Sequence, residues 1–293
     1  MSTTFKEVLD KGISYLQKNS ISDAKIDAWQ LMEFVWEINR SYYFVHLNDI
    51  IEPEKEEQYM SLIYRRGEYV PVQYITNQAD FMGHTFYVNE QVLIPRQDTE
   101  SLVEAVLQVV KDGDRILDMC TGSGCIILSL LLAKVGEPDV KASDDDKYIT
   151  TINGVGVDIS KTALAVAKKN ANKLNINVDF IKSNLFEKVD GIYDVIVSNP
   201  PYIHPEELES LMPEVREHEP ILALDGKEDG LYYYREIVKE ASKFLVAQGY
   251  LAFEIGYNQG EDVSGIMRSS GYTNVTIVKD LAGLDRVVIG RSS

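Results

Sequence analysis

Apolar residues in the first 72 positions recur at the spacing of an α-helix. The two series are Phe5, Val8, Leu9, Ile13 and Leu16, followed by Ala24, Ala28, Leu31, Met32 and Val35. Each series places its apolar side chains on one helix face, and Ser22 and Asp23 are expected to cap the second helix. A third helix is predicted from Pro53 to Gly67, because proline is favoured at the start of a helix and glycine at its end. Residues 1–72 are therefore predicted to be helical.

The pattern changes at residue 73. Over residues 73–95 apolar and polar residues alternate, aromatic residues are frequent, and Gly83 offers a turn; these features are typical of a β-hairpin. From residue 96 onward, apolar strand segments alternate with helical segments. We therefore predict a helical domain over 1–72, a hairpin linker over 73–95 and an α/β domain over 96–293.

The alternation in the larger domain predicts a mostly parallel sheet covered by helices on both faces. Strands are expected at 115–119, 154–158, 178–181, 193–198, 250–255, 275–279 and 286–289, and helices at 124–134, 161–174, 231–246 and 259–269. Only DLAGLD separates the last two strands, which is too short for a helical crossover, so these strands are expected to pair antiparallel. The polar residues 137–153 are expected to form a loop insertion.

Composition and charge exclude several classes of protein. The chain of 293 residues has a formal net charge of −17, whereas proteins that grip nucleic acid by its phosphates usually present a basic surface. We therefore expect no direct contact with nucleic acid. No apolar run is long enough to cross a membrane, and two cysteines without a signal peptide favour the reduced cytoplasm. No metal site is predicted.

A glycine-containing turn follows the first expected strand. In RILDMCTGSGC the strand ends at Asp118, and Thr121, Gly122, Ser123 and Gly124 form the turn into the next helix. The third glycine of a dinucleotide-binding loop and the lysine of a P-loop are both missing. An acidic residue ahead of the loop suits a cationic ligand, such as a sulfonium amino acid, better than a pyrophosphate. A purely structural turn remains the alternative.

Two later strand ends carry candidate ligand-binding residues. Asp158 ends the second expected strand, where a carboxylate can accept two hydrogen bonds from a ribose diol; the alternative is that it only caps the next helix. Asn184 and Leu185 follow the third strand. There Asn184 could contact an adenine edge while Leu185 covers the face of the ring.

The sequence Asn199-Pro200-Pro201-Tyr202 is the sharpest signal in the chain. Two successive prolines end a central strand because they cannot donate backbone hydrogen bonds, so this motif lies at the carboxyl end of the fourth strand. The side chain of Asn199 offers an acceptor and a donor that match a planar amide. With the Pro200 carbonyl as a second acceptor and Tyr202 as a wall, the motif could hold an amide nitrogen in line with a sulfonium methyl.

These motifs together resemble the class I methyltransferases that act on planar exocyclic or amide nitrogens. Four further segments resemble the peptide-chain-release-factor glutamine N5-methyltransferases, the HemK-type family, over nearly the whole chain. They are LIPRQDTE (93–100), EPILALDGKEDGL (219–231), FEIGYNQG (253–260) and KDLAGLDRVVIGR (279–291).

The resemblance implies a class I S-adenosylmethionine-dependent methyltransferase fold, α/β with a seven-stranded, mostly parallel sheet, and a small N-terminal helical domain that recognises the substrate. It implies S-adenosyl-L-methionine as the cofactor and the glutamine of the Gly-Gly-Gln loop of class I release factors as the methyl acceptor. The implied cofactor site contains Asp118, Thr121, Gly122, Ser123, Gly124, Asp158, Asn184, Leu185 and Asn199. The implied substrate site contains Asn199, Pro200, Pro201 and Tyr202, of which Asn199, Pro200 and Tyr202 are the expected catalytic residues.

The chain departs from the family pattern at two positions. Cys120 stands where the family usually has glycine, and Asn184 stands where it usually has aspartate. Both changes could weaken binding of the cofactor. Arg96, Thr99 and Glu100 lie in a family motif near the cofactor, and the sequence assigns them no individual roles.

Three other functions share parts of this pattern. A glutamine methyltransferase of a ribosomal protein would have almost the same cofactor loop and NPPY motif. An adenine-N6 DNA methyltransferase would share NPPY but needs a basic region to grip a flipped strand. A non-catalytic binding module could use the same fold as a scaffold; intact Asp158 and NPPY residues argue against it.

Overall fold

The computed structural model describes residues 3–135 and 150–293, and its contacts divide the chain into two compact units. The first contains Met1–Gln78 and Met212–His218, and the second contains Ala79–Leu211 and Glu219–Ser293. No pattern in the sequence indicates that a segment as late as 212–218 belongs with the N-terminal helices. None of the described helices is both long and apolar enough to span a bilayer.

The first unit is helical. Its elements are α1 (Phe5–Lys18), α2 (Ala24–Trp36), α3 (Arg40–Val45), α4 (Pro53–Gly67), α5 (Val72–Thr76) and the late segment α10 (Pro213–His218). Thr4 and Glu7 form a capping box at the start of α1. Asp23 stands at the N-cap of α2 as predicted, but its side chain makes no capping hydrogen bond. The helices α3 and α5 were missed because they are too short to show a helical period.

A buried ion pair lies inside this first unit. Arg66 of α4 donates from Nε to Asp27 Oδ2 over 2.6 Å and from Nη2 to Glu214 Oε2 over 2.6 Å. Only 5% of the Arg66 side chain is exposed. Glu214 of α10 is thus bound to the helical core by a charge-assisted hydrogen bond.

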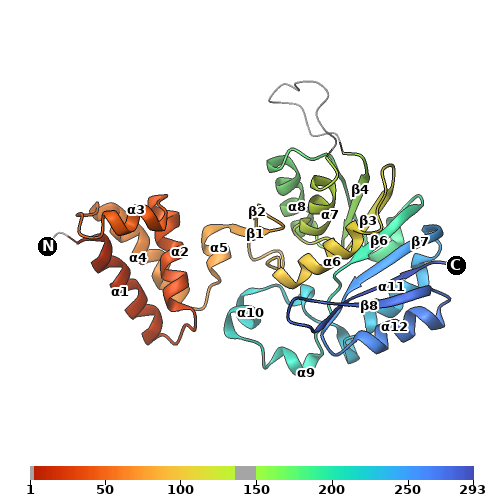
Figure 1. Cartoon of the computed structure of the whole chain (residues 1–293). Coiled ribbons are helices and arrows are strands. Elements are labelled where there is room, and N and C mark those ends of the chain that lie inside the picture. Colours follow the sequence, from red (N-terminus) through yellow and green to blue (C-terminus); the bar gives the residue numbers. More distant parts are fainter. Residues whose placement is uncertain (1–2, 136–149) are drawn as a thin grey trace, which may run out of the picture. The chain divides into compact units, whose positions relative to one another are not determined.

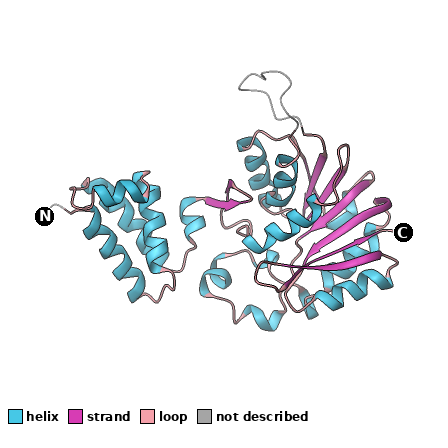
Figure 2. Ribbon diagram, viewed as in Figure 1, coloured by secondary structure: helices cyan, strands magenta, loops and turns pink. Residues whose placement is uncertain are grey.

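The second unit contains a seven-stranded sheet with the order β5-β4-β3-β6-β7-β9-β8 (Figures 1 and 2). The strands are β3 (Arg115–Met119), β4 (Asn153–Asp158), β5 (Asp179–Lys182), β6 (Tyr193–Ser198), β7 (Leu245–Glu254), β8 (Thr273–Lys279) and β9 (Asp285–Arg291). The first five pair in parallel, while β9 is antiparallel to both β7 and β8. The predicted fold class and the antiparallel final pair are confirmed.

Helices cover both faces of this sheet. They are α6 (Gln97–Leu107), α7 (Cys125–Leu132), α8 (Lys161–Lys173), α11 (Tyr232–Ala241) and α12 (Gly260–Ser269), with a short helix α9 (Pro205–Leu208) and the 3-10 turns η1 (Leu185–Lys188), η2 (Ile221–Ala223) and η3 (Lys227–Asp229). One apolar core contains residues of α6, α7 and α8, and a second core contains residues of α11 and α12. Two cores on one sheet are what a doubly covered parallel sheet requires.

Three predicted boundaries need correction. The hairpin is shorter than residues 73–95, because its strands are only β1 (Gln78–Phe81) and β2 (His84–Tyr87) and helix α5 precedes them. Helix α11 ends at Ala241 rather than near 246, since β7 begins at Leu245. The predicted insertion 137–153 lies mostly outside the described residues, and its last residue, Asn153, begins β4.

Candidate functional site

A cavity of about 460 Å³ lies at the carboxyl ends of β3, β4, β5 and β6. That volume is within the range of small-molecule sites, and the carboxyl edge is where open α/β sheets bind ligands. The predicted site residues that line it are Thr121, Gly122, Ser123, Asp158, Asn184, Leu185, Asn199 and Pro201. Four others, Asp118, Gly124, Pro200 and Tyr202, do not line this cavity. The ends of four strands, β3, β4, β5 and β6, therefore bring most of the predicted residues together.

The loop after β3 adopts left-handed backbone angles at three positions. The φ angles are +63° at Cys120, +54° at Gly122 and +80° at Gly124. A Cβ on Gly122 would meet open space, whereas one on Gly124 would lie 3.2 Å from Ala167. Gly122 therefore leaves the cavity floor free for a ligand, and Gly124 allows close packing of the loop against α8.

Asp118 supports this loop from below. Its carboxyl group is fully buried, and Thr121 Oγ1 donates to Asp118 Oδ2 over 2.5 Å. Burial raises the pKa of Asp118 to about 7, against the opposing effect of the Thr121 hydrogen bond. The sequence placed Asp118 in the cofactor site; in the structure its side chain holds Thr121, and Thr121 lines the cavity.

Asp158 joins two segments at the cavity wall. Its Oδ2 accepts from the backbone N–H of Gly122 over 2.9 Å, and its Oδ1 accepts from that of Ser160 over 2.8 Å. Ser160, not Asp158, caps α8, because Ser160 Oγ accepts from Ala163. Each carboxylate oxygen can accept a further hydrogen bond, so Asp158 fits a ribose diol, although burial raises its pKa.

Asn184 and Leu185 form another part of the wall. Asn184 Nδ2 donates to Glu187 Oε1 over 2.7 Å. Because a carboxylate only accepts, this contact fixes the amide orientation and leaves Asn184 Oδ1 available to accept from an amine. Leu185 has a φ of +47°, a conformation that is costly for a branched residue and that is often found at ligand sites.

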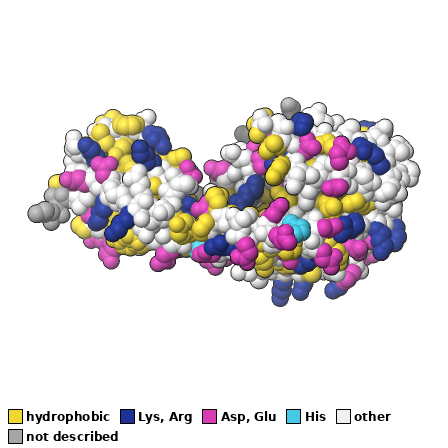
Figure 3. Space-filling view, turned by 90° about the horizontal axis from the view of Figure 1, so that it is seen from below, with side chains coloured by type: hydrophobic (Ala, Val, Ile, Leu, Met, Phe, Trp, Pro, Cys, Tyr) yellow, Lys and Arg dark blue, Asp and Glu magenta, His cyan; other side chains and the backbone are white. Residues whose placement is uncertain are grey.

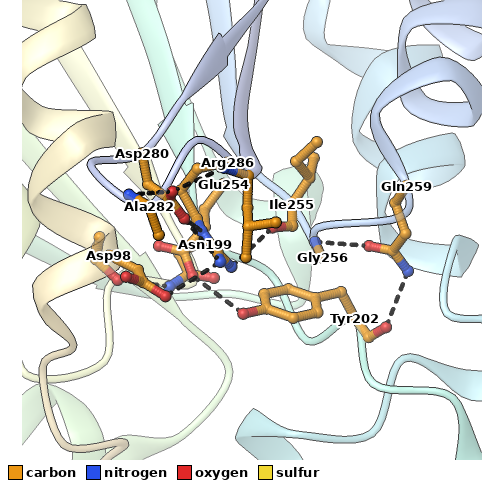
Figure 4. A network of polar contacts seen from close by, with 12 residues as sticks. Asp98, Asn199, Tyr202, Glu254, Ile255, Gly256, Gln259, Asp280, Ala282 and Arg286 are labelled. Atoms are coloured by element: carbon orange, nitrogen blue, oxygen red, sulfur yellow. Dashed lines mark hydrogen bonds and ion pairs between the residues drawn. The ribbon is translucent and has the colours of Figure 1, made fainter.

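Asn199 lies at the end of β6, beside α6. Its Nδ2 donates to Thr99 Oγ1 over 3.3 Å. Tyr202 makes contacts elsewhere: its hydroxyl donates to Glu254 Oε1 over 3.1 Å, and its carbonyl accepts from Gln259 Nε2 over 3.1 Å (Figure 4). Tyr202 therefore fixes the loop after β6 against the end of β7.

The structure also places the residues whose roles the sequence left open. Arg96 lines the cavity and forms an ion pair with the buried Glu219. Thr99 lines the cavity as well and accepts from Asn199. Glu100 Oε1 accepts from the backbone N–H of Met82 over 2.7 Å, so it holds the turn of the hairpin. The only signal for these residues was the family motif in which they lie.

The cavity offers binding groups rather than a nucleophile. Burial raises the pKa of the Cys120 thiol well above its usual range and that of Cys125 to about 12, so both thiols stay protonated and unreactive at neutral pH. Within residues 3–135 and 150–293, no cluster of His, Cys, Asp or Glu is arranged to hold a metal ion. The arrangement can bind and orient two reactants.

Two family models match the chain: the PrmC N-terminal domain over residues 7–76 and the methyltransferase small domain over residues 97–215. The release factor glutamine methyltransferase of Fusobacterium nucleatum is 39% identical over 98% of this chain and 78% of its own length. That of Geobacter sulfurreducens is 37% identical over 98% of this chain and 96% of its own length.

Solved structures agree on the fold. A methyltransferase from Pyrococcus furiosus is 15% identical, with a TM-score of 0.50, over 71% of this chain and 88% of that chain. The 16S rRNA N2 G1207 methyltransferase of T. thermophilus, solved with AdoMet and guanosine, is 16% identical with a TM-score of 0.50, over 74% of this chain and 50% of that chain. These likenesses concern the methyltransferase fold alone, whereas both sequence relatives match 98% of this chain. The chain belongs to the family of the release factor glutamine methyltransferases.

Proposed function

We propose that this protein transfers a methyl group from S-adenosyl-L-methionine to the side-chain amide nitrogen of the glutamine in the Gly-Gly-Gln loop of class I release factors, and so acts in translation termination in the cytoplasm. The observation that carries the proposal is that Asn199 and Pro201 line the same cavity as Thr121, Gly122 and Asp158. An amide-binding motif and a cofactor-binding loop thus share one space. The names of the relatives support the choice of substrate.

The cofactor supplies an electrophilic methyl group on a sulfonium, and the chain's own residues supply position. Asp158 is suited to accept from the ribose diol, and Asn184 Oδ1 is suited to accept from the adenine amine. An amide nitrogen is a weak nucleophile, because its lone pair is delocalised into the carbonyl. We propose that Asn199 Oδ1, which lies at the cavity, and the carbonyl of the adjacent Pro200, which is not among the lining residues, bind its hydrogens and hold the nitrogen in line with the methyl group.

We further propose that the first unit contributes to recognition of the release factor, and that nucleic acid is not a substrate. The net charge of −17 supports the second point. On the face of the protein drawn in Figure 3, lysine and arginine side chains are interspersed with aspartate and glutamate. Such a mixed surface is unlike the basic stripe with which proteins follow a phosphate backbone.

A labelling experiment tests the proposal directly. The full-length protein is incubated with methyl-labelled S-adenosylmethionine and an intact class I release factor, and the methyl group is mapped by mass spectrometry. We expect one methyl group on the glutamine of the Gly-Gly-Gln loop, and none on a release factor in which that glutamine is replaced by alanine. Labelling of ribosomal protein or of adenine in DNA, with the release factor unlabelled, would overturn the proposal.

A further inference from the structure

We propose that Thr99 and Glu254 are positioning residues that determine which atom of the Asn199 side chain faces the substrate. This inference rests on the proposed function, because it assigns a task to Asn199 in amide binding. It concerns two residues that do not belong to the cofactor loop or to the NPPY motif.

The three side chains come from separate elements and meet at the cavity, whose lining includes Thr99 and Asn199 but not Glu254. Thr99 lies in the first turn of α6 and is 3% exposed, Glu254 ends β7 and is 1% exposed, and Asn199 follows β6. Asn199 Nδ2 donates to Thr99 Oγ1 over 3.3 Å. Figure 4 shows Asn199, Tyr202 and Glu254 directed toward a common region. A buried carboxyl group at this point has no part in the mechanism given above, so it needs an explanation.

The carboxyl group of Glu254 accepts a hydrogen bond from a hydroxyl group on one of its two oxygens. Tyr202 donates to Oε1 over 3.1 Å. Oε2 is buried and has no hydrogen-bond partner among the described residues, and the Thr99 hydroxyl is the donor that the proposal assigns to it. Burial raises the pKa of Glu254 above its ordinary value, against the opposing effects of hydrogen bonding from Thr99 and Tyr202 and of the charge of Arg286. Arg286 is itself held by Asp98 and Asp280, each at 3.1 Å.

The direction of these hydrogen bonds decides the orientation of Asn199. A threonine hydroxyl can donate or accept, so Thr99 alone would tolerate either orientation of the amide. When Glu254 is ionised it only accepts, so a Thr99 hydroxyl that donates its single hydrogen to Glu254 must accept from Asn199 Nδ2 with its oxygen. Asn199 Oδ1 is then left to accept an N–H of the substrate amide. The opposite orientation would place an NH₂ group against the substrate's NH₂ group.

Substitutions at Thr99 separate this role from simple packing. Thr99→Val keeps the shape and removes the hydroxyl, whereas Thr99→Ser keeps the hydroxyl and removes a methyl group. We expect Thr99→Val to lower kcat for methylation of the release factor by about tenfold or more, the effect of losing about one hydrogen bond, with an unchanged Kd for S-adenosylmethionine by calorimetry. Thr99→Ser should restore most of kcat. Equal losses in both variants would overturn the proposal.

Substitution of Glu254 tests the direction of the bonds. Glu254→Gln keeps the volume but introduces an NH₂ group that can donate to Thr99, so it should lower kcat in the same way. Glu104→Gln is a matched control on α6, because Glu104 is exposed on that helix and should leave kcat unchanged. Thermal unfolding of each variant shows whether it is folded. Wild-type kcat in a folded Glu254→Gln protein would contradict the proposal.

A second measurement tests the orientation of the Asn199 side chain without any substrate. In the ¹⁵N-labelled protein without substrate, the side-chain NH₂ signals of Asn199 can be assigned by comparison with Asn199→Asp. We expect these signals to shift in Thr99→Val and Glu254→Gln and to stay in place in Glu104→Gln. If the release factor is not methylated but the shifts occur, only the proposed function fails. Unshifted signals would reject the positioning role whatever the substrate.

Discussion

The backbone N–H of Gly122 donates to Asp158 Oδ2 over 2.9 Å, which joins the loop after β3 to the end of β4. The Asp158 carboxylate therefore holds the loop after β3 in place and is also suited to bind the ribose of the cofactor. Replacing it affects both tasks.

We expect Asp158→Ala to weaken binding of S-adenosylmethionine by roughly 1.5–3 kcal/mol, the usual contribution of a hydrogen bond to a charged group. Isothermal titration calorimetry measures this. Ser160→Ala is a useful control, because it removes the cap of α8 and leaves the Asp158 carboxylate and its contact with the Ser160 backbone N–H in place, so it should lower stability more than affinity. Unchanged affinity in a folded Asp158→Ala protein would remove Asp158 from the ribose site.

Asn199→Ala should separate chemistry from binding of the cofactor. We expect turnover to fall by about 10²-fold or more, as when a preorganised polar contact to the reacting group is lost. The Kd for S-adenosylmethionine should change little, since Asp158 and the loop after β3 are untouched. Steady-state kinetics and calorimetry test the pair of expectations. A large loss of cofactor affinity with normal turnover would reverse the assigned role.

The buried carboxyl group of Asp118 predicts a pH dependence of stability. Burial raises its pKa from 3.8 to about 7 in the folded protein, so the folded state binds this proton more tightly than the unfolded state. The contribution is fully present below pH 3.8 and is lost as the pH rises to about 7, by at most roughly 1.4 kcal/mol per pH unit.

Asp118→Asn isolates this contribution, because asparagine cannot titrate and its Oδ1 can still accept from Thr121. Free energies of unfolding from urea titrations at pH 4 to 8 provide the measurement. The wild type should lose stability relative to Asp118→Asn as the pH rises, and the difference should level off above pH 7. A difference that is constant over this range would show that the pKa of Asp118 is not raised.

The φ of +63° at Cys120 predicts an unusual order of stability. At an ordinary position alanine stabilises a chain relative to glycine, but in the left-handed region a Cβ costs about 1 kcal/mol or more. We expect Cys120→Gly to be more stable than Cys120→Ala by about 1 kcal/mol in denaturant unfolding. The reverse order would mean that the loop does not keep this backbone conformation.

Loss of the buried cation at Arg66 should be severe. Arg66→Ala leaves Asp27 and Glu214 without their shared partner, and removing one member of a buried ion pair typically costs about 3–5 kcal/mol. Lys11→Ala breaks the ion pair with Glu56, in which the lysine side chain is 55% exposed, and should cost less than about 1 kcal/mol. Thermal unfolding of both variants tests this contrast. Similar effects would show that the Arg66 pair is not desolvated.

The sequence by itself determined the class of the fold and the residues that the strand ends contribute to the cavity. Strands that are buried on both faces read as apolar runs, so Arg115–Met119 and Tyr193–Ser198 were predicted with the bounds that the structure has. Glycine, proline and acidic residues directly after such strands had to fall at one edge of the sheet. Thr121, Asp158 and Asn199 could therefore be predicted together, since the carboxyl ends of parallel strands converge there.

Only the tertiary structure decided which side chains from distant elements meet Asn199. Thr99 and Glu254 are 155 positions apart in the chain, and no local period or motif spacing relates them to Asn199. The same is true of Arg66 and Glu214, whose attraction acts only after α4 and α10 have packed. The local sequence pattern shows whether a segment is a helix or a strand and which of its faces is buried. It does not show which side chain of a distant element will lie beside it, because that depends on how the elements pack. Asp118 shows the same limit: the sequence placed it at the strand end, and only the fold turned its carboxyl group away from the cavity and toward Thr121.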